Sequence, residues 1–519
     1  MNNNDHSVPG KLSRREFLGS SVAALGTLAT FSPTFSSAST TFELQSALKT
    51  KLTVKFIVNG CIHEAAYEGS CRVGELGNLT QEAERKALQD DFIRLQNELK
   101  TVPFPPQIEL LEPTAMHLWV EKGNPDIMLK DDQLNKLAQD DLKTDVYVVT
   151  GGGLPQYTGL RIAEQYHKPV ILANTAGWGL DLPAGLRRYG LEGFYVPDWA
   201  DLKQLLHLMA VRKSIRQTKI LNVTNFPEVV PKGVVSSIVD LDFLQQKYGI
   251  GYQNVNYDEF FSEMDLTVKE NTILAEAEKI ASELMANANN NNMTREDIVN
   301  SLLFYFNTKK IMHKYACNAF TIECFELCSS LHPWNRRFTP CLTHALLKDA
   351  GFASACEKDL NALIAMMVEM YLARKAVYMG NPDINVKENI LTIHHSVASR
   401  QLKGIEQPMT PYEITSFTQA GFGATLRYDF SQDSGEPVTV SRFDPSATKL
   451  LVSKGTVIGG SGLDGCGCAQ TVNIRIPNGK QLLRKQQDFG HHLALVFGDY
   501  IDEIDLLGEL MGFEVVNVS

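Results

Sequence analysis

The chain is short of positive charge and of long apolar segments. Its 519 residues carry 49 Lys and Arg against 60 Asp and Glu, a formal net charge of −11, without any long Lys/Arg run. Proteins that hold nucleic acid neutralise phosphates with clustered positive charge, so we expect no nucleic-acid partner. Beyond residue 40, no segment has the roughly 20 consecutive apolar residues that a membrane-spanning helix needs, so we expect no stable membrane anchor.

Cysteine is also scarce, and its count of nine is odd. If the chain is exported, some cysteines can pair, but the sequence does not fix which. Cys317, Cys324 and Cys328 recur at i, i+7 and i+11, which predicts one face of a helix packed into the core. Cys466-Gly-Cys468 lacks the two-residue gap and the nearby second pair of a zinc site. We interpret that pair as structural, with a redox role as the alternative.

Residues 1–40 are typical of a targeting segment. Residues 13–18 read SRREFL, a twin-arginine pattern, and the apolar stretch FLGSSVAALGTLATF and small polar residues follow. No cysteine follows the apolar stretch, which argues against a lipoprotein anchor. We expect cleavage near Ala38 and export by the twin-arginine pathway to the periplasm or the cell exterior. That pathway carries folded proteins, so export is consistent with a metal site.

Length and element pattern predict several domains. A single core stops growing at about 250–300 residues, so we expect about two to four domains. Strand-like and helix-like segments alternate along 45–216 and again along 217–375, which predicts two Rossmann-like α/β domains with parallel sheets. From about residue 400, short alternating segments separated by Gly, Asp and Pro predict an antiparallel, barrel-like β-rich domain over 376–519. The expected fold class is therefore α/β with a β-rich C-terminal domain.

The stretch 341–395 places acidic and imidazole side chains at the ends of predicted elements. A turn carries Glu357 and Asp359 before a helix, and two strand-like segments flank a predicted turn at 380–383, the second ending in His395. Sites in open α/β sheets are built at such ends. The plain alternative is that Glu357 and Asp359 only cap the helix, since negative charge favours the positive pole of a helix dipole.

These residues and a later pair of histidines form a possible set of metal ligands. The set comprises Glu357, Asn381, Asp383, His394, His395, His491 and His492. Carboxylate and imidazole ligands suit Mn²⁺, Co²⁺, Mg²⁺ or Zn²⁺. Such an ion can bind adjacent oxygens of an aldose and stabilise the cis-enediolate that forms when a carboxylate moves a proton between C2 and C1. The alternative for each histidine is an ordinary packed or surface imidazole.

Three segments resemble the L-fucose/L-arabinose isomerase superfamily, in particular its fucose isomerase-like branch. They read GFASACEKDLNALIAMM (351–367), ENILTIHHS (388–396) and GHHLALVFGDYIDEIDLLGELMGFEV (490–515). The branch typically has AACE-x-D, then an Asp-ending strand, EN…HCG and a late G-x-H before GD. The resemblance implies a sugar substrate, a divalent metal with Mn²⁺ first, and a trimeric or hexameric homo-oligomer.

The resemblance also implies roles for individual residues. Glu357 matches the metal-binding, proton-transferring glutamate, and His492, or His491, matches the C-terminal metal histidine. Asn381 stands where the family has a second acidic ligand, so Asp383 is a candidate second base. His395 matches the histidine of HCG, although Ser396 replaces its cysteine.

We therefore predict an aldose–ketose isomerase-like enzyme of a sugar or sugar derivative. Its catalytic residues are Glu357 and Asp383, and its metal ligands are Glu357, Asn381 and His492. His395 and His491 contact the substrate. The alternatives are an exported lyase or epimerase on the same scaffold, and a non-catalytic carbohydrate-binding protein in which neutral Asn381 marks a lost metal site.

Overall fold

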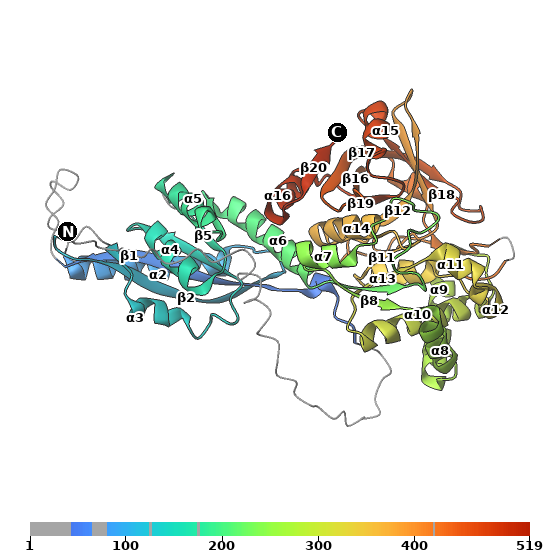
Figure 1. Cartoon of the computed structure of the whole chain (residues 1–519), viewed down its shortest axis with the longest axis horizontal. Helices are drawn as coiled ribbons and strands as arrows, with labels where there is room; N and C mark the ends of the chain where they lie inside the picture. The colour runs from blue at the N-terminus through green and yellow to red at the C-terminus, as the bar shows by residue number, and fades with distance from the viewer. Residues whose placement is uncertain (1–42, 65–79, 124–126, 174–176, 419–420) are drawn as a thin grey trace, which may run out of the picture. The chain divides into compact units, whose positions relative to one another are not determined.

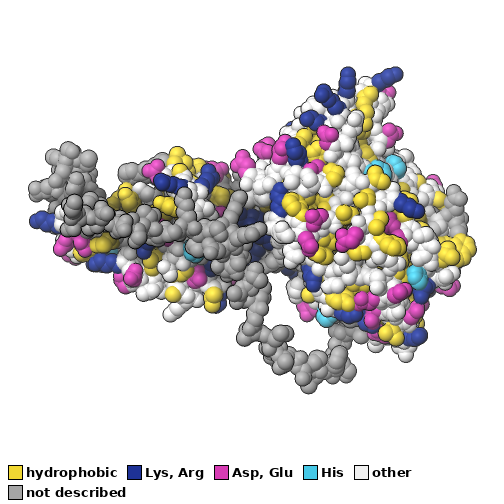
Figure 2. Space-filling model, in the orientation of Figure 1, with side chains coloured by type: hydrophobic (Ala, Val, Ile, Leu, Met, Phe, Trp, Pro, Cys, Tyr) yellow, Lys and Arg dark blue, Asp and Glu magenta, His cyan; other side chains and the backbone are white. Residues whose placement is uncertain are grey.

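The computed structural model describes residues 43–64, 80–123, 127–173, 177–418 and 421–519 (Figure 1). The predicted export signal lies outside them. No helix within these ranges is both long and apolar enough to cross a membrane. On the face in Figure 2, positive and negative side chains of the described residues are intermixed rather than separated by sign. The fold is mixed α/β, as expected.

The first sheet is the parallel α/β unit expected near the N-terminus. Its strands are β1 (Leu52–His63), β2 (Ile108–Val120), β3 (Ile127–Met128), β4 (Val146–Gly151), β5 (Val170–Ala173) and β6 (Gly193–Val196). Their order is β3-β2-β1-β4-β5-β6, and all neighbours are parallel except β2 and β3. The helices of this part are α2 (Gln81–Thr101), α3 (Asp131–Leu134), α4 (Pro155–Tyr166), α5 (Asp181–Arg188) and α6 (Trp199–Arg216).

The second sheet is also parallel, with the order β11-β10-β7-β8. Its strands are β7 (Lys219–Val223), β8 (Gly251–Val255), β10 (Ala319–Ile322) and β11 (Ala353–Ala355). Its helices are α7 (Leu241–Tyr248), α8 (Tyr257–Thr267), α9 (Asn271–Asn287), α10 (Arg295–Lys314), α11 (Cys324–Ser329), α12 (His332–Arg336), α13 (Cys341–Asp349) and α14 (Leu360–Ala373). The chain leaves β10 for α11 and leaves β11 for α14, so residues following both strands gather at one edge of the sheet.

The C-terminal part contains a closed antiparallel ring, which confirms the barrel-like expectation. The strands are β12 (Tyr378–Asn385), β13 (Ile390–His395), β16 (Pro437–Phe443), β17 (Lys449–Ser461), β18 (Gln470–Arg475), β19 (Leu493–Phe497) and β20 (Glu514–Asn517). Their order is β16-β19-β12-β13-β18-β17-β20; pairing of β16 with β17 closes the ring of the first six, and β20 adds to β17 as a parallel strand outside it. A small sheet joins β9 (Asn290–Asn291), β14 (Glu413–Thr415) and β15 (Thr425–Arg427), and the helices are α15 (Gly479–Gln486) and α16 (Ile501–Met511).

Helix α14 is the buried centre of the largest core cluster, and residues 360–372 are all buried. Its side chains pack with those of β11, β16 and β19, including Ala355 and Val496. Even its polar Asn361 is satisfied, since it accepts from Ile238 N at 2.6 Å and donates to Phe443 O at 3.0 Å. The N-terminus of α14 is therefore held rigidly where the second sheet meets the ring.

Two local predictions are wrong. The three cysteines from Cys317 to Cys328 do not share a helix face, because α10 ends at Lys314, Ala316 adopts a left-handed φ of 52°, and β10 intervenes. The apolar AFTI segment there resembles a continuing helix, but its aromatic and β-branched residues favour a strand.

The predicted turn at 380–383 lies inside β12, where Pro382 pairs with Ile393. Only 378–380 also pair with β19, so Pro382 occupies an edge position. Proline, which lacks a backbone donor, is tolerated there. The chain reverses after Asn385 instead, over the four residues before β13.

Candidate functional site

Glu357 lies in the short turn between β11 and α14, in an unusual backbone conformation. Its φ is 60° and that of Lys358 is 52°, both in the left-handed region that non-glycine residues seldom adopt. Such strain costs about 1–3 kcal/mol per residue and is kept where surrounding contacts enforce it. Lys358 supplies such contacts: its Nζ donates to the carbonyls of Phe226, Pro227 and Val229 at 2.8, 3.0 and 2.9 Å.

The Glu357 carboxylate faces two histidine rings. Oε1 lies 3.5 Å from His395 Nε2, and Oε2 lies 3.7 Å from His492 Nε2. His395 ends β13 and His492 directly precedes β19, and the two ring centroids are 5.4 Å apart. Both rings are buried, and among the described residues neither Nε2 has a hydrogen-bond partner. A buried polar atom without a partner is costly, so both nitrogens require an explanation.

A buried ion pair orients His492. Its Nδ1 donates to Asp359 Oδ2 at 2.8 Å, and Arg442 Nη1 donates to the same oxygen at 2.6 Å. Arg442 also donates to the carbonyls of His492 and Phe489, at 2.9 and 2.7 Å. With Nδ1 protonated, Nε2 presents its lone pair toward Glu357. This is the carboxylate–histidine arrangement that supports metal-binding imidazoles.

The charges agree with that tautomer. Burial acts to raise the pKa of Asp359, but the Arg442 guanidinium and the His492 hydrogen bond hold it below its ordinary value. Burial lowers the pKa of His492, with Asp359 acting in the opposite direction. Asp359 is therefore ionised and His492 neutral at neutral pH.

His395 differs from His492 in charge. Burial alone would lower its pKa, but Cys468, whose Sγ lies 3.9 Å from Nδ1, and Glu357 together raise it to about 10. Burial acts to raise the pKa of Glu357, but the neighbouring rings of His395, His492 and His491 outweigh it and lower that pKa. His395 is therefore a cation facing an ionised carboxylate.

The remaining predicted site residues lie at different distances from this group. His491 is exposed, stacks on His492 with centroids 4.6 Å apart, and places Nδ1 3.2 Å from Gly233 O. Asn381 is half-buried, pairs with His394 of β13, and directly follows Gly380, the last residue of β12 that pairs with β19.

Asp383 is exposed two residues further along β12 and pairs with Thr392. No hydrogen bond or ion pair between described residues joins it to Glu357. The structure thus brings together Glu357, His395 and His492, with His491 at the rim, but not Asp383.

A loop from Phe226 to Ser236 packs over the carboxylate. A Cβ atom at Gly233 would lie 2.9 Å from Glu357 Oε2 and would overlap the Phe325 ring, so only glycine fits there. Lys358 holds the start of this loop, and Arg442 Nη2 donates to Ser236 Oγ at 3.2 Å near its end. Glu357 is accordingly only 9 % exposed.

The sequence analysis did not assign four residues to the site that the structure places there: Gly233, Lys358, Arg442 and Cys468. Arg442 carried a usable signal, because in PVTVSRF it takes the place of an apolar residue, two positions after Val440 in the alternation. Lys358 lies between two acidic residues in Glu-Lys-Asp, which hints that it stabilises the turn that carries them. The plain alternative for Asp359 holds in part, because its carboxylate accepts from Ala362 N at 3.0 Å and caps α14.

In comparisons with protein-family models and with curated proteins, nothing matches this chain. The site is therefore interpreted from its own geometry. A carboxylate, a neutral imidazole with a free lone pair and an imidazolium converge in one largely buried place. Together they can bind a divalent cation, accept a proton from carbon and donate a proton to oxygen.

Proposed function

We propose that this chain is a metal-dependent aldose–ketose isomerase that acts on a sugar or sugar derivative through a cis-enediol. The observation that carries the proposal is the convergence of Glu357 and His492 Nε2 at 3.7 Å without a hydrogen bond. Two acceptors with facing lone pairs repel unless a proton or a cation lies between them. The Asp359 partner fixes the proton of His492 on the other nitrogen, which favours a cation.

The donor set fits a divalent ion of the Mn²⁺ class, with Co²⁺, Mg²⁺ or Zn²⁺ as alternatives. Ligands about 2.1 Å from an ion lie about 3–3.5 Å apart, close to the separation of Glu357 and His492. Glu357 and His492 would hold the ion, and the amide oxygen of Asn381, one residue beyond the last β12–β19 pair Gly380–Leu493, is the third ligand of the proposal. When bound, such an ion polarises adjacent hydroxyl and carbonyl oxygens of a sugar.

The chain's own groups account for the proton transfers. Ionised Glu357 is a competent acceptor for a proton on the carbon next to a sugar carbonyl, and after partial exchange with solvent it delivers a proton to the neighbouring carbon. His395, charged at neutral pH, donates to a sugar oxygen that gains negative charge. The loop at Gly233 keeps water away from one carboxylate oxygen. His491 at the rim contacts the substrate, and Asp383 is retained as the alternative second base.

The proposal includes the setting of the enzyme. The SRREFL segment supports export by the twin-arginine pathway, and the resemblance supports a trimeric or hexameric homo-oligomer. N-terminal sequencing of the exported chain tests cleavage near Ala38. Light scattering of the mature chain tests the oligomer.

The test begins with the metal content of the mature chain, purified without chelator, beside Glu357→Gln. We expect the variant to lose about one equivalent of Mn, Co or Zn per chain relative to the wild type. Sugars are then screened in D₂O, where isomerisation places deuterium on a single sugar carbon in the wild type only. A control, Glu388→Gln, changes an exposed glutamate in the turn between β12 and β13, away from the β11–α14 turn, and should retain both properties.

Three outcomes would contradict the proposal. An unsaturated product absorbing in the ultraviolet would identify a lyase, and inversion of one carbon without a ketose would identify an epimerase. Undiminished sugar binding by metal-free protein, with no turnover in any form, would identify a binding protein.

A further inference from the structure

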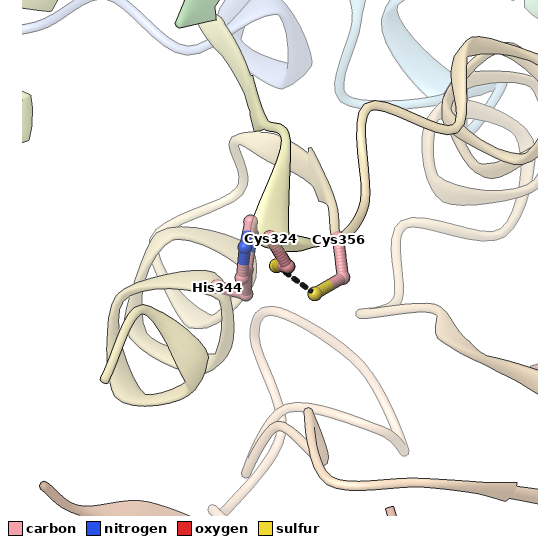
Figure 3. Close-up of side chains that lie close together, drawn as sticks. All are labelled: Cys324, His344 and Cys356. Atoms are coloured by element: carbon pink, nitrogen blue, oxygen red, sulfur yellow. Dashed lines mark hydrogen bonds between the residues drawn. The ribbon is translucent and has the colours of Figure 1, made fainter. Parts of the chain in front are cut away.

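A second group of side chains that could hold a metal ion lies close together in Figure 3. It consists of Cys324 at the start of α11, His344 in α13 and Cys356 directly after β11. The two Sγ atoms are 2.9 Å apart, and one ligand atom from each residue lies within 4.8 Å of the others. Cys356 and His344 are buried, whereas Cys324 is half-buried, so the group has a route to solvent.

His344 points to a ligand for this group. Its ring is fully buried and stacks on Phe320, with centroids 5.4 Å apart. Nδ1 lies 2.7 Å from Ser354 Oγ, while Nε2 has no hydrogen-bond partner among the described residues. A serine that fixes one ring nitrogen and leaves the other free is the arrangement by which outer partners orient metal-binding imidazoles.

We propose that Cys324, His344 and Cys356 form a second metal site, for a thiophilic cation of the Zn²⁺ class. Thiolate and imidazole ligands select such ions, and two cysteines with one histidine form a zinc ligand set that leaves a fourth position for water. The Glu357 group instead offers carboxylate and imidazole, which also accept harder ions, and the Cys356 thiol lies within 4.8 Å of ligand atoms of Glu357 and His395 as well. With two thiols, the Cys324 group is the softer ligand set of the two, although Cys356 lies close to both.

A disulfide between the two cysteines is the competing interpretation. The separation of 2.9 Å lies between the about 2.05 Å of a disulfide and the about 3.7 Å expected for two thiolates on a tetrahedral zinc ion. Either end state therefore requires a shift of under about 1 Å, and the distance does not discriminate. His344 does, because a disulfide leaves its buried Nε2 without a partner, whereas a cation satisfies all three residues.

The consequence reaches the neighbouring site. Cys356 is covalently adjacent to Glu357, so an ion here joins the ends of β10 and β11 to α13 and fixes the turn that carries the carboxylate. The inference does not depend on the proposed isomerase activity.

The test uses the reduced, metal-free mature chain titrated with Co²⁺ and then Zn²⁺. Thiolate ligation gives sulfur-to-cobalt charge-transfer bands in the near ultraviolet, which Zn²⁺ should abolish stoichiometrically. We expect Cys324→Ser to weaken binding by more than about 100-fold, beyond the 10–100-fold that loss of an outer partner costs. Cys317→Ser, a buried cysteine outside the group, should retain the bands, and so should Glu357→Gln, which separates this site from the Glu357 site.

Alkylation of the wild type provides a second measurement that needs no variant. Zn²⁺ should protect Cys324 from alkylation while exposed Cys328 and Cys466 react as before. Absence of charge-transfer bands in reduced wild type, or bands unchanged in Cys324→Ser, would overturn the proposal. So would a Cys324–Cys356 disulfide that persists under the reducing conditions and excludes both ions.

Discussion

Two buried carboxylates of the α14 segment lie in contrasting surroundings. Asp359, 0 % exposed at the N-cap, contacts Arg442, His492 and the backbone N–H of Ala362. Glu369, 1 % exposed in the middle of the helix, accepts only from Ser441 Oγ at 2.6 Å, and its Oε2 has no partner among the described residues.

The two environments shift pKa in opposite directions. The pKa of Asp359 is held low by Arg442 and His492 against burial, whereas burial raises that of Glu369 well above its ordinary value. Burial alone therefore favours a neutral carboxyl group in this core. Of these two carboxylates, Asp359, which orients a histidine of the candidate site, is the one paired with a cation, so the contrast separates a charge that serves the site from an enclosed carboxyl group.

The largest expected effect comes from removing that cation. Arg442→Met keeps side-chain length but leaves Asp359 buried and unpaired, which should cost about 3–5 kcal/mol of unfolding free energy. Urea denaturation measures the loss. The matched control is Arg427→Met, because Arg427 is equally buried but donates to the carbonyls of Gly462 and Gly467 rather than to a carboxylate.

One outcome of comparing Arg442→Met with Arg427→Met would contradict this expectation. If Arg427→Met and Arg442→Met lose the same free energy, the pairing with Asp359 is not the source of the stability. Adding Asp359→Asn to Arg442→Met should recover part of the loss, since no unpaired charge then remains. It should not recover metal binding, because His492 stays without its charged partner.

How far the sequence predicted this arrangement depends on the range of the interactions. Alternating and periodic apolar segments are local signals, so the parallel sheets and the β-rich end were foreseen. The prediction of a turn at 380–383 was wrong because Asn-Pro-Asp is a local turn signal, whereas pairing with β13 imposes a strand there. The helix through Cys317 failed for the same reason, since β10 exists only beside β7 and β11.

The residues of the site also differ in whether local sequence signals or long-range contacts reveal them. Glu357, His395 and His492 could be proposed because the resemblance and their places at element ends single them out. The pairing of Arg442 with Asp359 joins residues 83 positions apart, and that of Cys324 with Cys356 joins residues 32 positions apart. No periodic pattern in the sequence predicts these two contacts, because they form only when the fold brings the strand ends together.

An intermediate effect is expected at Glu369. Because its folded pKa is raised above the unfolded value, its contribution to stability is complete below the unfolded pKa and is lost as pH rises. Glu369→Gln removes the cost of an ionisable group in the core. It should gain about 1–2 kcal/mol over wild type at pH 8 and little at pH 4. Denaturant unfolding between pH 4 and 8 measures the difference, and a gain that is constant with pH would contradict this account.

The smallest effect on stability is expected at Asp383, the exposed carboxylate of β12. Asp383→Asn should change the unfolding free energy by no more than about 0.5 kcal/mol, since a solvated carboxylate has neither a burial cost nor a fixed partner to lose. Metal content should also stay at the wild-type level, because Glu357 and His492 are the proposed ligands. Activity is the informative measurement. Unchanged isomerisation removes Asp383 from the mechanism and leaves proton transfer to Glu357 alone, whereas loss of turnover with metal intact means that the carboxylate reaches the substrate from its exposed position on β12.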